Sequence, residues 1–264
     1  MVGNFGLLLV DHIHFQYNGL IIGISLLFLS ELSNGNILTA ALIFAFMLNL
    51  KHLFLYVAPF VGIYMLSVIS NPKSIFESML QLVKLASAVV FVFALSFGPF
   101  ASKGTYGIFE LTFLKTYLDQ IIQIFTRLFP VSRGLTHSYW AGNIWALYNA
   151  VDIAMSKFLK IGKSSNLTSG LLPRSRGDNL SFNVLPEISP RICVILMLIS
   201  IIPMLRSVWK SPRGKEIQGY YVCALASFIF GYHVHEKAIL ISLIPLTVLG
   251  NRFKKILVLN LFRI

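Results

Sequence analysis

Three clusters of polar and ionisable residues interrupt an otherwise apolar sequence, and chemistry could occur at each of them. The most concentrated is Gly231–Lys237, where four of five consecutive positions are ionisable: His233, His235, Glu236 and Lys237. Histidine or lysine could bind an anionic phosphate here, and Glu236 could orient or neutralise the base. A Glu–Lys pair can also be a neutralised helix end. So many ionisable groups between two apolar runs nevertheless favour a functional site.

The second cluster lies between residues 127 and 149 and combines an arginine with aromatic rings and amides. Its candidate residues are Arg133, His137, Tyr139, Trp140 and Asn143. A planar guanidinium binds two phosphate oxygens at once, and aromatic faces beside amides suit a sugar. The same residue types also anchor a protein at a membrane interface, with the arginine paired to a lipid headgroup. The sequence leaves both interpretations open.

The third cluster leads into the first long apolar run and contains Asp11, His12, His14, Gln16 and Asn18. Ionisable groups at a membrane boundary are costly unless they are paired or hydrated, so a functional site is as good an interpretation as an interfacial belt. His12 and His14 have His-x-His spacing, which on a helix directs the two rings to different sides. We therefore expect no metal site in this cluster.

The composition shows what kind of protein must position these clusters. Of the 264 residues, 56% are hydrophobic and only 12% are charged, against about 25% charged in an average soluble domain. This excludes a soluble globular protein. The 22 Lys and Arg against 10 Asp and Glu give a net charge of +12. These charges fall between apolar segments, as at membrane flanks, so we expect a membrane partner and no nucleic acid.

The apolar runs predict an all-α, polytopic integral membrane protein with about seven membrane helices. The runs fall at roughly 19–33, 37–50, 53–69, 82–100, 192–205, 219–234 and 238–251. The short basic loop 206–216 is expected in the cytosol. His233–Lys237 and the long connections within 101–191 then fall on the other, lumenal side, provided that a helix at 142–160 lies along the membrane instead of crossing it. The glycosylation sequons at Asn166 and Asn179 suit that side.

Four segments together resemble a known family, the endoplasmic-reticulum glucosyltransferases that use dolichyl-phosphate glucose. They are Asp11–Gly19, Leu50–Pro59, Arg127–Leu135 and His233–Lys237. Residues 134–149 resemble the branch of the family that adds the second glucose to the lipid-linked N-glycan precursor.

The resemblance implies a GT-C fold, here in part, with its active site at the lumenal face of the endoplasmic-reticulum membrane. The implied reaction transfers glucose from dolichyl-phosphate glucose to dolichyl-diphosphate-linked Glc1Man9GlcNAc2 in an α-1,3 linkage, with neither a cofactor nor a metal. Arg133 and the His233–Lys237 cluster would belong to the donor-phosphate region, and the other candidate residues would serve substrate binding.

The family's general base is a carboxylate near a Tyr-Pro-Pro motif, and no such motif occurs in this sequence. We therefore expect residues 1–264 to be the central portion of a larger transmembrane domain, without the catalytic base and inactive alone. Two alternatives stay open. The first is a transporter or channel in which His12, His14, His233 and His235 bind protons or metal ions. The second is a non-catalytic binder of the lipid-linked oligosaccharide.

Overall fold

The computed structural model describes Leu9 and residues 17–70, 74–102, 118–124, 126, 135–136, 141–160, 182 and 184–261. These residues form helices and no strand, which confirms the all-α prediction. The α-helices are α2 (Asn18–Asn34), α3 (Ile37–Leu50), α4 (Ala58–Ile69), α5 (Ile75–Ser102), α7 (Ile144–Phe158), α8 (Pro190–Lys210), α9 (Glu216–Phe230) and α10 (Leu240–Leu261). Two 3-10 helices, η2 (His52–Val57) and η3 (Glu236–Ile239), precede α4 and α10.

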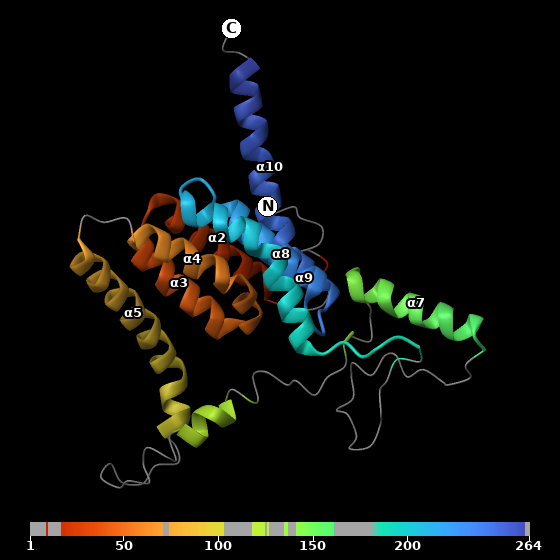
Figure 1. Ribbon diagram of the computed structural model, residues 1–264. Helices are drawn as coiled ribbons and strands as arrows, with labels where there is room; N and C mark the ends of the chain where they lie inside the picture. Colours follow the sequence, from red (N-terminus) through yellow and green to blue (C-terminus); the bar gives the residue numbers. More distant parts are fainter. Residues whose placement is uncertain are drawn as a thin grey trace.

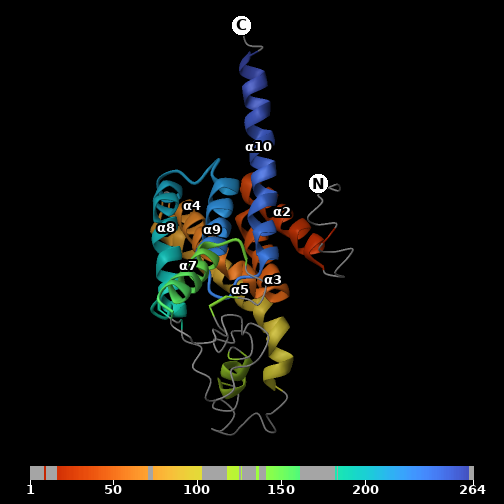
Figure 2. The same cartoon turned by 90° about the vertical axis from the view of Figure 1, so that its right-hand side faces the viewer.

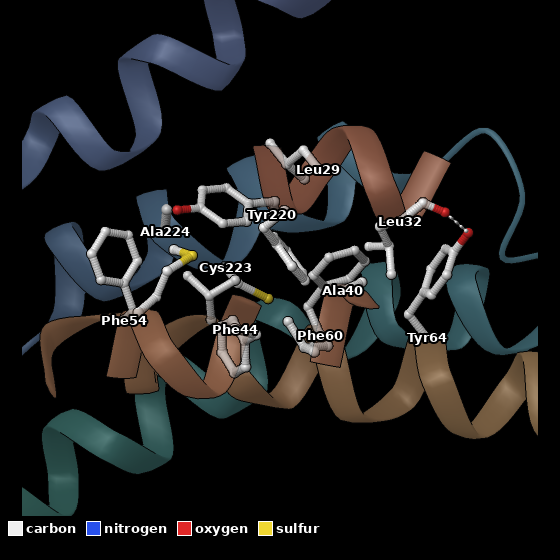
Figure 3. Close-up of a cluster of buried hydrophobic side chains, with 14 of the residues drawn as sticks. Leu29, Leu32, Ala40, Phe44, Phe54, Phe60, Tyr64, Tyr220, Cys223 and Ala224 are labelled. Carbon is white, nitrogen blue, oxygen red and sulfur yellow. Dashed lines mark hydrogen bonds between the residues drawn. The ribbon is translucent and has the colours of Figure 1, made fainter. Parts of the chain in front are cut away.

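Helices α2, α3, α4, α8 and α9 pack into a bundle, α5 packs against α3 at its edge, and much of α10 extends away from it (Figure 1). Close-packed aromatic side chains fill the interior of the bundle (Figure 3). The ring of Phe28 lies 5.4 Å from that of Phe44 and 6.3 Å from that of Tyr220, measured between centroids. Gly219 on α9 permits this packing, because a Cβ atom there would overlap the buried ring of Phe60.

Three described helical segments are long and apolar enough to cross a membrane: His52–Ile69, Ile75–Phe100 and Pro190–Lys210. Helices α2 and α3 are apolar but shorter. The membrane character expected from the composition is therefore present in the helices, and the total of about seven crossings stays a prediction. Helix α5 starts at Ile75 and so extends the apolar run expected at 82–100, because Glu77 and residues 79–81 (Met, Leu, Gln) are good helix formers.

A helix is present where one was expected at 142–160, since α7 covers Ile144–Phe158. Asn143 starts it, because its side-chain oxygen accepts hydrogen bonds from the backbone N–H groups of Trp145 (3.2 Å) and Ala146 (3.3 Å). Helix α7 lies crosswise to α8, beside the end of α9 (Figures 1 and 2). Its orientation along a membrane stays a prediction.

Candidate functional site

The segment from Gly231 to Lys237 leaves α9 through a tightly packed corner. A Cβ atom at Gly231 would collide with the carbonyl oxygen of Ser227 and a methyl group of Val234, so only glycine fits without displacing its neighbours. His233 then adopts a left-handed backbone conformation, with φ of 54°. Such a conformation costs a residue with a side chain about 1–3 kcal/mol and persists only where surrounding contacts impose it. The corner therefore holds its residues in one defined arrangement.

A carboxylate–imidazole pair occupies the middle of this segment. Nδ1 of His235 lies 2.8 Å from Oε2 of Glu236, and both side chains remain accessible, at 37% and 46% exposure. The same Nδ1 atom also accepts a hydrogen bond from the backbone N–H of Lys237 at 3.4 Å, so two neighbours hold the His235 ring at the start of η3. The described partner of Glu236 is thus His235, and its role in orienting or neutralising a base stays a prediction.

One backbone hydrogen bond joins the second cluster to this corner. The N–H of His233 donates to the carbonyl oxygen of Leu135 at 2.8 Å. Leu135 follows Arg133 by two positions in the sequence, so the arginine-bearing segment and the histidine-bearing segment meet although about a hundred residues separate them. Arg133 itself, with His137, Tyr139 and Trp140, lies outside the described residues.

Helix α7 reinforces the same junction from the side. The indole Nε1 of Trp145 donates to the carbonyl oxygens of Gly231 (3.0 Å) and Phe230 (3.2 Å), at the end of α9. The amide of Asn149 donates to Oγ1 of Thr136 at 3.1 Å. Asn143, expected to bind substrate, is 8% exposed and acts as the N-cap of α7. A role for it in substrate binding stays a prediction.

Asp152 was not among the candidate residues, yet it is fully buried and holds a separate segment against α7. Its Oδ1 atom accepts hydrogen bonds from the backbone N–H groups of Val184 and Leu185, both at 2.9 Å. Nearby, the hydroxyl of Tyr148 donates to the carbonyl oxygen of Pro186 at 2.7 Å. Desolvation and the negative charge of Asp152 raise the pKa of Tyr148, so this hydroxyl keeps its proton.

The inner face of α7 could have been recognised from the sequence. Its four buried side chains follow helical spacing of four, three and four positions: Trp145, Asn149, Asp152 and Ser156. A polar stripe with this period in a protein so apolar marks a face that contacts other parts of the chain. The sequence does not, however, indicate which segments that face would contact.

The end of the third cluster lies at the same end of the bundle. Asn18 starts α2, and its side-chain oxygen accepts a hydrogen bond from Nζ of Lys51 at 2.8 Å. One turn further along α2, Ile22 packs against Leu240 and Ile244 of α10, directly after the His233–Lys237 segment. Asp11, His12, His14 and Gln16 lie outside the described residues. The described parts of all three clusters thus gather at one end of the bundle, opposite the basic loop between α8 and α9.

Comparison with known proteins identifies the family. Residues 1–264 match the ALG6, ALG8 glycosyltransferase family. The chain is 40% identical over 263 residues to the dolichyl pyrophosphate Glc1Man9GlcNAc2 alpha-1,3-glucosyltransferase of Mus musculus, covering 95% of this chain and 47% of that protein. Proteins of the same name from Neurospora crassa (40% identity; 96% of this chain, 49% of the relative) and Schizosaccharomyces pombe (38%; 93% and 47%) are similarly related.

The chain spans about half the length of the curated relatives it matches. The resemblance stated from the four sequence segments is confirmed, because the match covers the whole chain and includes the clusters that meet at the end of α9. The chain therefore belongs to the ALG6, ALG8 glycosyltransferase family, whose members are membrane-embedded glycosyltransferases.

Proposed function

We propose that this chain is the central part of an enzyme that transfers glucose from dolichyl-phosphate glucose to dolichyl-diphosphate-linked Glc1Man9GlcNAc2, forming an α-1,3 bond. The observation that carries the proposal is the 40% identity, over 95% of the chain, to a protein named for that acceptor and linkage. The donor is inferred from the family resemblance of the His233–Lys237 and Arg127–Leu135 segments.

The geometry at the end of α9 supports binding of an anionic donor. His235 and Lys237 provide groups that can carry positive charge at this corner, and Leu135, two positions after Arg133 in the sequence, is hydrogen-bonded to it. Dolichyl phosphate is an acceptable leaving group without protonation, so the protein has to bind its charge and needs no general acid there. The acceptor hydroxyl requires a base, which we do not assign to any residue of this chain.

We further propose that the protein resides in the endoplasmic-reticulum membrane with this corner facing the lumen. The basic loop between α8 and α9, with Lys210, Arg213 and Lys215, lies at the opposite end of α9 and suits the cytosolic side. Helix α7 supports a position at the lumenal interface, because it turns Leu147 (69% exposed) and Phe158 (87%) outward while Asn149, Asp152 and Ser156 face the protein.

The decisive experiment is to disrupt the gene that encodes the chain and to analyse the lipid-linked oligosaccharides by chromatography. We expect Glc1Man9GlcNAc2 to accumulate on dolichol and the forms with more glucose to disappear. Accumulation of the glucose-free Man9GlcNAc2 form would assign the protein to the first glucose instead. An unchanged profile would contradict enzymatic function and favour a transporter or a non-catalytic binder.

Re-expression then tests the two levels of the proposal separately. The longest natural product of the gene should restore the normal profile, and the 264-residue chain alone should not. In the gene product that restores the profile, Lys237→Met should raise KM for dolichyl-phosphate glucose about tenfold, because it removes one charge-assisted contact worth about 1.4 kcal/mol. Lys157→Met, at the exposed end of α7, is the matched control and should leave KM unchanged.

A further inference from the structure

A groove between α4 and α8 lies near the basic loop, at the end of the bundle opposite the candidate site. Its volume is about 520 Å³, and it is lined by Ile63 of α4 and by Ile202, Leu205, Arg206, Trp209 and Lys210 of α8. The lining surface is almost entirely apolar, so Arg206 and Lys210 contribute mainly their aliphatic stems to it. Both side chains are exposed, which leaves their charged ends at the rim of the groove.

The packing of α8 against α4 fixes the lining in place. The hydroxyl of Ser67 on α4 donates to the carbonyl oxygen of Trp209 at 2.8 Å, and Val208 is fully buried beside it. Val208 points inward, whereas the side chain of Trp209, about 100° further around the helix, is 51% exposed. The indole therefore stands at the rim of the groove on a backbone that is held by a hydrogen bond.

The two cations of the groove have no acidic partner in the part of the chain that the structure describes. Arg206 and Lys210 are four residues apart on α8, so they share a face of the helix, and both are exposed. Glu216, the first residue of α9, is the nearest acidic residue along the chain, but it is buried and accepts hydrogen bonds from the hydroxyl of Tyr64 (2.8 Å) and the N–H of Gly214 (2.9 Å). The positive charge of the groove is thus available to a ligand.

The position of the groove along α8 indicates the ligand. Helix α8 is a candidate membrane span of 21 residues, which is about 31 Å long and matches the hydrocarbon core of a bilayer. Its last turn, with Arg206, Trp209 and Lys210, then lies at headgroup level, where tryptophan and snorkelling cations are favoured. Ile202 lies about one turn deeper than Arg206, and Leu205 about one turn deeper than Trp209, on the side of the acyl chains.

We propose that this groove binds one anionic phospholipid, with its phosphate between Arg206 and Lys210 and an acyl chain along Ile63, Ile202 and Leu205. Charge complementarity selects an anionic headgroup over a zwitterionic one, and the aliphatic lining selects a lipid over free phosphate. The site is independent of glucosyl transfer. Its test therefore uses lipid retention as the readout, so that its failure is distinguishable from failure of the proposed function.

The test is native mass spectrometry of the purified protein released from micelles that contain equal amounts of phosphatidylserine and phosphatidylcholine. We expect one phosphatidylserine to be retained, with a preference of roughly 30-fold over phosphatidylcholine, because both basic residues near the headgroup attract the anionic lipid. The double variant Arg206→Gln/Lys210→Gln should reduce this preference to nearly equal retention. The double variant Lys157→Gln/Lys160→Gln removes the same charge from the end of α7 and should keep the preference.

Two further measurements separate the contributions of charge and groove. Leu205→Trp should fill the aliphatic end and lower phosphatidylserine retention with both cations intact, while glycerol phosphate should not displace the lipid. Equal retention of both lipids by the unmodified protein, an unchanged preference in Arg206→Gln/Lys210→Gln, or displacement by glycerol phosphate would each overturn the proposal. Melting temperatures of the variants are compared with that of the unmodified protein, and any variant melting lower is replaced by its single substitutions.

Discussion

Replacing Asp152 with alanine should release the backbone at residues 184–185 from α7. The carboxylate is fully buried, and one of its oxygens accepts both backbone hydrogen bonds at 2.9 Å. A hydrogen bond to a charged group contributes about 1.5–3 kcal/mol. Since the two amides are only partly buried, we take the lower value for each, which gives about 3 kcal/mol for the pair. That free energy corresponds to roughly a 100-fold change in the local opening equilibrium.

Hydrogen–deuterium exchange measures this opening directly. In Asp152→Ala, the amides of Val184 and Leu185 should exchange roughly 100-fold faster, because their acceptor is gone. Asp152→Asn keeps an oxygen acceptor without the charge and should give a smaller acceleration, since neutral hydrogen bonds contribute about half as much. The control is Glu187→Ala, which removes an exposed carboxylate from the same segment.

The pattern across the chain decides whether the reasoning is correct. The amide of His233, bonded to Leu135, should keep its exchange rate in Asp152→Ala, because Trp145 and Asn149 still connect α7 to that corner. Unchanged exchange at residues 184–185 in Asp152→Ala would refute the assigned role of the carboxylate. Equal acceleration at His233 would show that α7 detaches as a whole and that its contacts are not separable.

Two further substitutions test the packing of the bundle. Gly219→Ala forces a methyl group against the ring of Phe60 and should lower the stability of the purified protein by about 1–3 kcal/mol in a thermal melt. Gly62→Ala is the control and should not lower stability, because a Cβ atom there meets open space. Equal melting temperatures of the two variants would contradict the predicted overlap. Tyr64→Phe removes the hydroxyl that donates to the buried Glu216 at 2.8 Å and should lower stability by about 1.5–3 kcal/mol. A melting temperature equal to that of the unmodified protein would show that the carboxylate does not need this donor.

Hydropathy alone was sufficient to predict the helical architecture, because each described apolar run becomes a helix. The joining of the first and second clusters could be inferred only as a shared membrane face. Its physical form, a backbone bond between His233 and Leu135, depends on tertiary packing that no local pattern specifies. Asn143 shows the opposite case: an asparagine directly before an apolar helical stretch is a typical N-cap, and this local signal was available in the sequence.

Helix α7 connects the composition of the sequence with the architecture of the site. A surface helix of a soluble protein turns its apolar face inward, but α7 buries Asn149 and Asp152 and exposes Leu147, Val151 and Phe158. Leaving each large apolar side chain in water forgoes about 1.5–3 kcal/mol, so this orientation is favourable only if the outer face meets an apolar medium. A membrane surface would supply that medium, in line with the lumenal interface proposed for α7. The inner face is then free to use polar side chains, which bind the backbones of Gly231 and of residues 184–185 with a directional specificity that apolar packing does not provide.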